Sequence, residues 1–380
     1  MLQGGIPIGK AFGISLRLHW SWFIIFVLIT WALSTSYFPS TYPHWSLAEG
    51  VTAGIITSLF FFGSVLVHEL MHSITALRKG IHIASITLFI LGGVSAMTEE
   101  PEKAKDEFFI AAAGPVTSLV LGGLFWGVWI ALGGTNAAAG SNEFIAAIVF
   151  WLGYINLALG IFNLIPGFPL DGGRVLRSLI WWRTGRLQNA TKIASNIGRV
   201  IGYLFILGGV YLVFTGDLFN GIWLALIGWF LESSAAGSYN LLLMQDMLKG
   251  HVAAEIMSRD CQMIPSDITL EKLVNEYIMK SGRRCFPVVS EGQVEGLISL
   301  RDVQKVPKDS WANQIVRDAM VPLDKLKSVQ PDTDLNTVMQ TLAQNDINQV
   351  PVVDENNIVG MVGRDHIVNF INVRTQLKQR

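Results

Sequence analysis

The sequence predicts a polytopic α-helical membrane protein, with six transmembrane helices and a small membrane-associated β element, followed by a cytosolic α/β domain pair. Its 380 residues are 51% hydrophobic and only 15% charged, which is too apolar for an ordinary soluble enzyme. Six apolar stretches of about membrane-spanning length precede residue 250. The polar remainder repeats itself after about 64 residues, which indicates a duplicated unit. We therefore expect residues 1–250 to form the membrane domain.

The six apolar stretches define the expected transmembrane helices. They cover residues 20–37, 51–77, 109–132, 144–165, 198–215 and 219–243. The fifth is short and rich in glycine. The first is too long for a cleavable signal and lacks a cleavage site, so we expect a retained anchor.

Basic residues predict the orientation. Arg78 and Lys79 close the second stretch, and a loop expected between the fourth and fifth stretches is strongly basic. That loop carries Arg174, Arg177, Arg183, Arg186, Lys192 and Arg199. Basic loops face the cytoplasm, so both termini are expected there. The two cysteines, Cys261 and Cys285, indicate no disulfide framework and fit a reducing compartment.

The second apolar stretch contains His68-Glu69-Leu70-Met71-His72. This H-E-x-x-H spacing puts two imidazoles one helical turn apart on one face, where both can bind one metal ion. The glutamate between them can deprotonate a metal-bound water. The pattern also occurs by chance in soluble helices, but ionisable groups in a membrane segment are costly and usually functional. The motif therefore predicts a hydrolytic metal site within the membrane.

A third ligand is expected from the segment that follows the fourth stretch. Asp171 lies there among prolines and glycines that break the helix and let the backbone turn tightly. The remaining histidines lie at the ends of the apolar stretches or outside them. The alternative is a turn that ends the span, with Asp171 in solvent.

These two motifs together resemble the site-2 protease family of intramembrane zinc metalloproteases. His68-Glu69-Leu70-Met71-His72 is similar to the family's first motif, and residues 163–172 (NLIPGFPLDG) to its second. Ala113-Gly114-Pro115 also looks like the family. The resemblance implies zinc held by His68, His72 and Asp171, with Glu69 as the general base.

Two further roles follow from the resemblance. Asn163 could donate a hydrogen bond to the developing oxyanion or to the substrate backbone; alternatively, it bonds the broken backbone of its own loop. Residues 81–97 are expected to form a membrane-inserted hairpin or sheet. Its edge strand could pair with an extended substrate near Gly92 and Gly93, or it could be an ordinary buried hairpin.

The C-terminal repeat resembles a pair of cystathionine-β-synthase (CBS) modules, with expected boundaries at residues 251–308 and 309–380. Pro287-Val288-Val289 in the first copy corresponds to Pro351-Val352-Val353 in the second. Each copy is expected to follow the order β-α-β-β-α, with a helix at 270–280 in the first copy.

Such modules commonly bind adenine nucleotides. The first copy carries the signature as Gly296, Ser299 and Asp302, and we expect ATP or another adenine nucleotide at Ser299 and Asp302. The second copy departs from it, because Gly360 is followed by Gly363 and His366, with Asp365 one place early. One nucleotide site is therefore expected rather than two. The alternative is that the pair is only a docking or dimerisation platform, which would make the protein a homo-oligomer.

The leading functional prediction is an intramembrane zinc endopeptidase that acts on transmembrane protein substrates in the lipid bilayer, modulated through the CBS pair. One alternative is a non-catalytic scaffold, although a scaffold has no need of the zinc-binding set and Glu69. The other is a CBS-regulated metal transporter, although the spans show no internal repeat. We expect no nucleic-acid partner.

Overall fold

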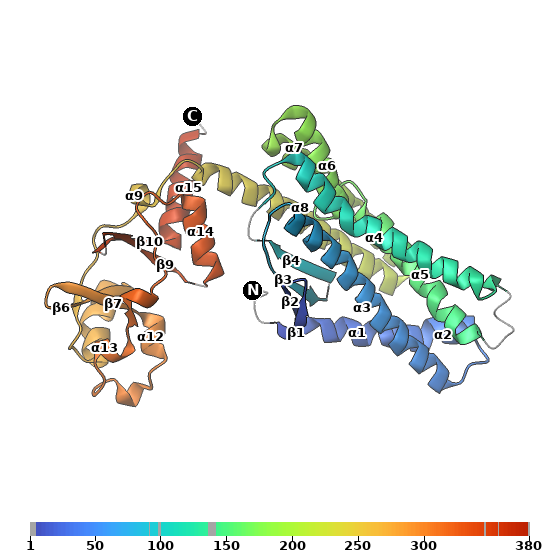
Figure 1. Ribbon diagram of the computed structural model, residues 1–380, viewed down its shortest axis with the longest axis horizontal. Coiled ribbons are helices and arrows are strands. Elements are labelled where there is room, and N and C mark those ends of the chain that lie inside the picture. The colour runs from blue at the N-terminus through green and yellow to red at the C-terminus, as the bar shows by residue number, and fades with distance from the viewer. Residues whose placement is uncertain are drawn as a thin grey trace. The chain divides into compact units, whose positions relative to one another are not determined.

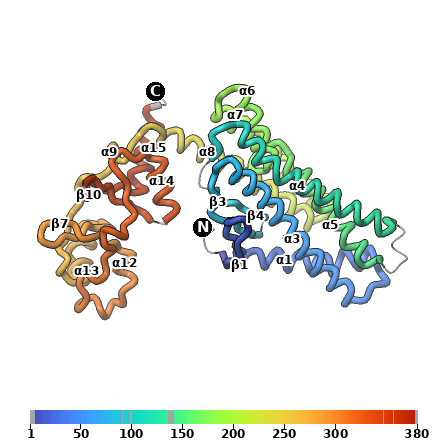
Figure 2. The backbone as a smooth tube through the Cα atoms, viewed as in Figure 1, coloured from blue at the N-terminus to red at the C-terminus, as the bar shows by residue number. Residues whose placement is uncertain are grey.

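The computed structural model describes residues 5–90, 92–97, 100–135, 142–345, 347–355 and 357–378. The chain divides into two compact units, Met1–Asn240 and Leu241–Arg380, each of which is described by itself. Figure 1 labels the helices and strands, and Figure 2 follows the backbone from blue at the N-terminus to red at the C-terminus.

Within the described residues, six helices are long and apolar enough to cross a membrane. They are Ser21–Thr41, α3 (Leu47–Arg78), α4 (Ala104–Ala131), α5 (Glu143–Asn163), α7 (Leu187–Phe214) and α8 (Leu218–Leu248). The first comprises α1 (Ser21–Ala32), a π-helical stretch (Leu33–Tyr37) and α2 (Phe38–Thr41). Many of their large apolar side chains are exposed, as a surface facing lipid requires. The predicted fold class is confirmed.

The segment between the fourth and fifth spans differs from the prediction. The basic region expected as a loop contains α6 (Asp171–Thr184), which ends at Gly185 in the left-handed conformation. The fifth span then begins at Leu187 rather than near residue 198. A criterion of apolar length misses its first turns because they are polar, although residues such as Gln188, Ala190 and Lys192 are good helix formers.

A four-stranded sheet lies beside these helices, in the order β1-β2-β3-β4. Its strands are β1 (Ile6–Ala11), β2 (Ile14–Leu18), β3 (Ile83–Phe89) and β4 (Gly92–Met97). The β3–β4 hairpin is the one that the sequence predicts, whereas β1 and β2 were not predicted. β2 pairs with β3 in parallel, and the other pairs are antiparallel. Among the described strands β4 pairs only with β3, so it forms one edge of the sheet.

The helix α4 is the centre of the membrane unit. It packs against α3, α5 and α6, as Figure 1 also shows for α3 and α5. Close packing with α5 uses glycine, since a Cβ on Gly153 would meet Trp126 at 2.3 Å. Small residues likewise let α7 and α8 approach closely, through Gly202 against Gly228.

The C-terminal unit shows the predicted duplication. Each copy contains an antiparallel hairpin, β6 (Cys285–Ser290) with β7 (Gln293–Ser299), and β9 (Gln349–Asp354) with β10 (Asn357–Gly363). In the first sheet, β5 (Ile264–Pro265) and β8 (Val321–Pro322) flank the hairpin, in the order β5-β6-β7-β8. The α-helices are α9 (Ala253–Ile256), α10 (Leu270–Lys272), α11 (Met279–Ser281), α12 (Leu300–Gln304), α13 (Val316–Ala319), α14 (Leu335–Gln344) and α15 (Arg364–Lys378). A π-helical stretch joins α10 to α11, so the helix expected at 270–280 is present but not regular throughout.

Candidate active site

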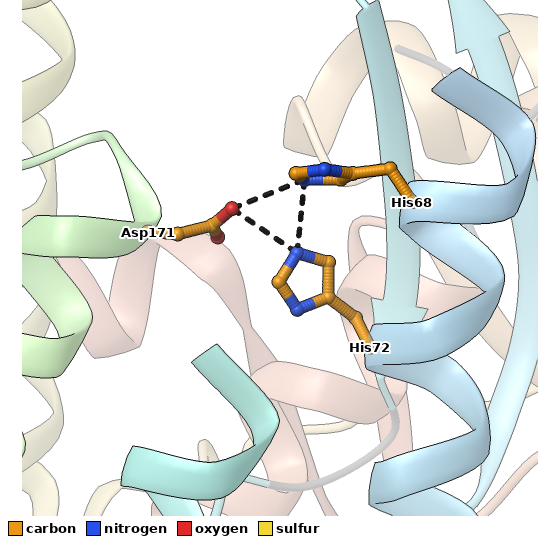
Figure 3. Close-up of side chains that lie close together, drawn as sticks. All are labelled: His68, His72 and Asp171. Atoms are coloured by element: carbon orange, nitrogen blue, oxygen red, sulfur yellow. Dashed lines mark hydrogen bonds and ion pairs between the residues drawn. The ribbon is translucent and has the colours of Figure 1, made fainter. Parts of the chain in front are cut away.

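The helix α3 places His68 and His72 on one face, as expected for residues four positions apart. The two residues are buried, with exposed fractions of only 5% and 4%. Asp171 is the first residue of α6, and its side chain faces both imidazoles from the opposite side of the site (Figure 3). The structure thus brings Asp171 to two histidines that lie about a hundred positions earlier in the chain.

Their donor atoms form a compact triangle. Nε2 of His68 lies 3.2 Å from Nε2 of His72, and Oδ2 of Asp171 lies 3.2 Å and 3.1 Å from these two nitrogens. Donor atoms on a tetrahedral zinc ion lie about 3.3 Å apart, because zinc–ligand distances are about 2.0–2.1 Å. The triangle therefore has the dimensions of three corners of a zinc site.

The hydrogen bonds behind the imidazoles support this interpretation. Nδ1 of His72 lies 2.6 Å from the carbonyl oxygen of Ile110 and must donate to it, because a carbonyl only accepts. In a neutral ring, Nε2 then carries a lone pair that faces the carboxylate of Asp171. Two lone pairs repel one another unless a proton or a metal ion lies between them. A metal ion satisfies all three donor atoms at once.

His68 is held in a similar way, since its Nδ1 lies 2.9 Å from Oγ of Ser118, which is fully buried. Such partners fix the tautomer and the orientation of a metal-binding histidine. Ile110 and Ser118 both belong to α4. Between them lies Gly114, where an added Cβ would be 2.1 Å from Nε2 of His72 and 2.6 Å from Nε2 of His68. Only glycine leaves room for the site at this position.

Glu69 is tied to the edge strand of the sheet. Ser95 on β4 donates to Oε2 of Glu69 at 3.0 Å, and Ser73 donates to Ser95 at 3.1 Å. A Cβ on Gly93 would lie 2.4 Å from Cγ of Glu69, so this glycine packs directly against the glutamate. Gly92 has a φ of 128° and nothing near its missing Cβ. The structure thus packs Gly93 against the predicted base, whereas the space beside the Cα atom of Gly92 is open.

Asn163 is the last residue of α5, and its amide nitrogen donates to the carbonyl oxygen of Leu159 at 3.0 Å, within its own helix. The loop beyond it is packed backbone to backbone. A Cβ on Gly172 would lie 2.3 Å from the carbonyl oxygen of Leu164, and one on Gly173 would lie 2.4 Å from the backbone of Gly167. These contacts position Asp171 through a rigid turn.

In the C-terminal unit, Ser299 is the N-cap of α12 and forms a capping box with Asp302. Oδ2 of Asp302 accepts from the Ser299 hydroxyl at 2.5 Å, and Oδ1 accepts from Lys305 at 2.8 Å. Burial raises the pKa of Asp302, but the bonds from Lys305 and Ser299 outweigh it, so the pKa lies below its ordinary value. In the second copy, Nδ1 of His366 accepts from the amide of Gly363 at 3.4 Å. In both copies the side chain at the last signature position accepts from the backbone amide three residues earlier, at 3.1 Å in the first copy.

Comparison with known proteins identifies the family. The model of peptidase family M50 matches residues 56–145 and 130–207, and the model of the CBS domain matches residues 252–309 and 316–373. The chain is 32% identical to Rip3 of Mycobacterium tuberculosis over 380 residues, which cover 98% of this chain and 94% of the relative. The chain belongs to peptidase family M50, the site-2 proteases. This M50 peptidase is also 28% identical to Zinc metalloprotease MJ0392 of Methanocaldococcus jannaschii, over 97% of this chain and 96% of the relative.

Among solved structures, a site-2 protease from Methanocaldococcus jannaschii is 28% identical and covers 62% of this chain and 95% of that chain, with a TM-score of 0.41. The predicted family and enzyme class are confirmed: the protein is a zinc metalloendopeptidase with a C-terminal CBS pair. Its six apolar helices make this M50 peptidase a multi-pass membrane protein. The roles of individual residues stay predictions.

Proposed function

We propose that this M50 peptidase hydrolyses peptide bonds of transmembrane substrates within the membrane, with one zinc ion held by His68, His72 and Asp171. The observation that carries the proposal is the triangle of donor atoms, with sides of 3.1 to 3.2 Å. Two of its corners, His68 and His72, belong to a helix of membrane-spanning length. Zinc in such a site lowers the pKa of a coordinated water and polarises a carbonyl as a Lewis acid.

Glu69 acts as the proton carrier of the reaction. Its carboxylate accepts a proton from the attacking water as the oxygen–carbon bond forms. It returns the proton to the amide nitrogen as the carbon–nitrogen bond breaks. Ser95 supports this role, because its hydroxyl donates to Oε2 and holds the carboxylate in one orientation.

The edge strand β4 presents the substrate. A peptide bond in a helix is shielded from attack, so a substrate helix must unwind, and an extended peptide can then pair with the free edge of β4. Gly92 and Gly93 allow a close approach of this peptide. Since Gly93 and Ser95 of the same strand contact Glu69, a peptide added to β4 is brought beside the base.

Asn163 completes the site as an oxyanion donor. Its present bond to Leu159 lies within its own helix, so the role requires the side chain to rotate toward the substrate when the substrate binds. The alternative is that Asn163 only stabilises the end of α5. An Asn163→Asp variant loses the amide donor that both roles use. A lower kcat with unchanged thermal stability supports the oxyanion role, whereas lower thermal stability with unchanged kcat supports the alternative.

The CBS modules, proposed at residues 251–308 and 309–380, regulate the peptidase. ATP or another adenine nucleotide binds at Ser299 and Asp302, where the aspartate exchanges its capping contacts for ribose hydroxyls. Binding shifts the pair and alters access of substrate to the membrane unit. The alternative is a platform for docking or homo-oligomer formation. Both termini lie in the cytoplasm, as the basic residues after α3 and in α6 indicate.

The test is peptide-bond cleavage by purified protein reconstituted into liposomes with a tagged single-span substrate. Mass spectrometry of the products should place the cut inside the apolar segment of the substrate. The matched control is Glu69→Gln, which keeps the shape of the side chain but cannot accept the proton. A cut confined to the extramembrane tails, or equal cleavage by Glu69→Gln, contradicts the proposal.

A further inference from the structure

A buried ion pair joins α4 to α6 close to the metal site and takes no part in the chemistry proposed above. Glu107 on α4 is fully buried, and Arg177 on α6 is only 8% exposed. Nε of Arg177 donates to Oε1 of Glu107 at 2.6 Å, and Nη2 contacts the same oxygen. Charges in such a place are costly to desolvate, and the pair adds little net stability over apolar residues of the same size. Stability alone therefore does not account for this pair.

The surroundings hold the guanidinium from several sides. Its central carbon lies 5.3 Å from the ring centre of Phe168, in the loop that leads to Asp171. Glu100 approaches Nη1 of Arg177 at 3.9 Å, and Arg174 approaches Oε1 of Glu107 at 3.9 Å. A planar guanidinium held by a carboxylate and a ring has a defined position and rotation. This arrangement therefore fixes the position and rotation of α6 against α4 more narrowly than apolar packing does.

The helix α4 carries a series of anchors along one face. Glu107, Ile110, Gly114 and Ser118 follow one another at spacings of three or four residues, which places them on the same side of a helix. Ile110 and Ser118 bond the outer nitrogens of the two histidines, and Gly114 lies against both rings. Glu107 extends this series to α6, the helix that begins with Asp171, through its bond with Arg177. The helix α4 thus contacts both histidines directly and also contacts α6.

We infer that the Glu107–Arg177 pair is a positioning device that sets the register of α6 on α4 and so places Asp171 opposite His68 and His72. This inference rests on the proposed function, in which Asp171 is a zinc ligand. A helix rises about 1.5 Å and turns about 100° per residue, so a small slip of α6 moves its first residue by more than a zinc–ligand bond tolerates, about 0.2 Å.

The test separates an effect on the position of Asp171 from an effect on the stability of the fold. Glu107→Leu combined with Arg177→Met removes both charges, so no uncompensated charge remains in the interior and thermal stability should stay near that of the wild type. Zinc affinity, measured by chelator competition on purified full-length protein, should nevertheless fall about 10- to 100-fold, as for other groups that orient metal ligands. The absorption spectrum of the cobalt-substituted protein should change as well, because it reports ligand geometry.

Two further variants complete the design. Arg177→Lys keeps the charge but loses the planar guanidinium group. This variant should still fold, and its zinc affinity should be lower than that of the wild type. Arg199→Met breaks a more exposed arginine–glutamate contact between α7 and α8, where Nε of Arg199 lies 2.9 Å from Oε1 of Glu232, and it should leave zinc affinity and the cobalt spectrum unchanged.

The outcomes distinguish this inference from the proposal on which it rests. A double variant, or an Arg177→Lys variant, that binds zinc within two-fold of the wild type overturns the positioning role. Asp171→Ala serves as the reference. If it also binds zinc with wild-type affinity, the ligand set itself is wrong; if it loses zinc while the paired variants do not, only the positioning role fails.

Discussion

Replacing Gly114 by alanine should destroy the metal site without removing any ligand. The new Cβ would lie 2.1 Å from Nε2 of His72 and 2.6 Å from Nε2 of His68, where ordinary contacts are 3.4 Å or longer. The His72 ring must therefore retreat by about 1.3 Å, because the helix backbone cannot give way to it. Zinc–ligand distances tolerate about 0.2 Å, so we expect zinc affinity to fall ~100-fold or more and cleavage to be lost.

The assay is the zinc content of purified protein, together with a chelator competition and a thermal melt. Gly127→Ala on the same helix is the matched control, since no atom lies within 4 Å of its added Cβ. That variant should keep its zinc, and its helix should be no less stable, because alanine favours a helix by about 1 kcal/mol over glycine. If Gly114→Ala binds zinc as tightly as the wild type, α4 does not pack against the three zinc-binding atoms as closely as these distances require.

Three other predictions concern Glu69 and the C-terminal unit. Ser95→Ala removes the hydroxyl that holds Glu69, so kcat should fall about ten-fold while zinc content is unchanged; an unaltered kcat contradicts the role of Ser95. Gly93→Ala places a Cβ 2.4 Å from Cγ of Glu69 and should likewise lower kcat but keep zinc, whereas loss of zinc points to misfolding. Because the folded pKa of Asp302 lies below its unfolded value, its contribution to stability is present above the ordinary value of about 3.9 and is lost as pH falls through the folded pKa. The protection of amides in the CBS unit of the full chain against hydrogen exchange, corrected for the intrinsic exchange rate at each pH, should thus fall on acidification below about pH 4, and less so in Asp302→Asn.

Much of the site follows from spacing within single segments. His68 and His72 are four residues apart on a helix, so their approach to one another is a property of helix geometry alone. The placement of Asp171 was predictable only from the pairing of two motifs in the chain. By contrast, the sequence did not reveal Ser118 or the carbonyl of Ile110 as partners of the histidines. Both act through contacts between α3 and α4, and a serine or an isoleucine in an apolar helix usually serves only packing. Gly114 gave a weak signal, as part of a short motif of small residues.

The fold shows the same division. Long apolar stretches predict spans well, but the criterion fails where a helix continues into polar residues, as in α7, or is amphipathic, as in α6. The strands β1 and β2 are short; β1 pairs with β2, and β2 pairs with β3 across some seventy positions of the chain, a tertiary contact that local pattern does not reveal. The capping role of Asp302 was also not predicted from the sequence. The Ser-x-x-Asp pattern at this place is typical both of a helix N-terminus and of a nucleotide-binding signature, and the prediction rested on the second alone.

The most direct test of the central claim compares zinc content and cleavage in the same preparations of wild type, Glu69→Gln and Asp171→Ala. The account predicts about one zinc ion per chain in the wild type and in Glu69→Gln, a clear loss of zinc in Asp171→Ala, and cleavage of a single-span substrate only by the wild type. Cleavage by Glu69→Gln at a rate near that of the wild type, or full zinc content in Asp171→Ala, would contradict it.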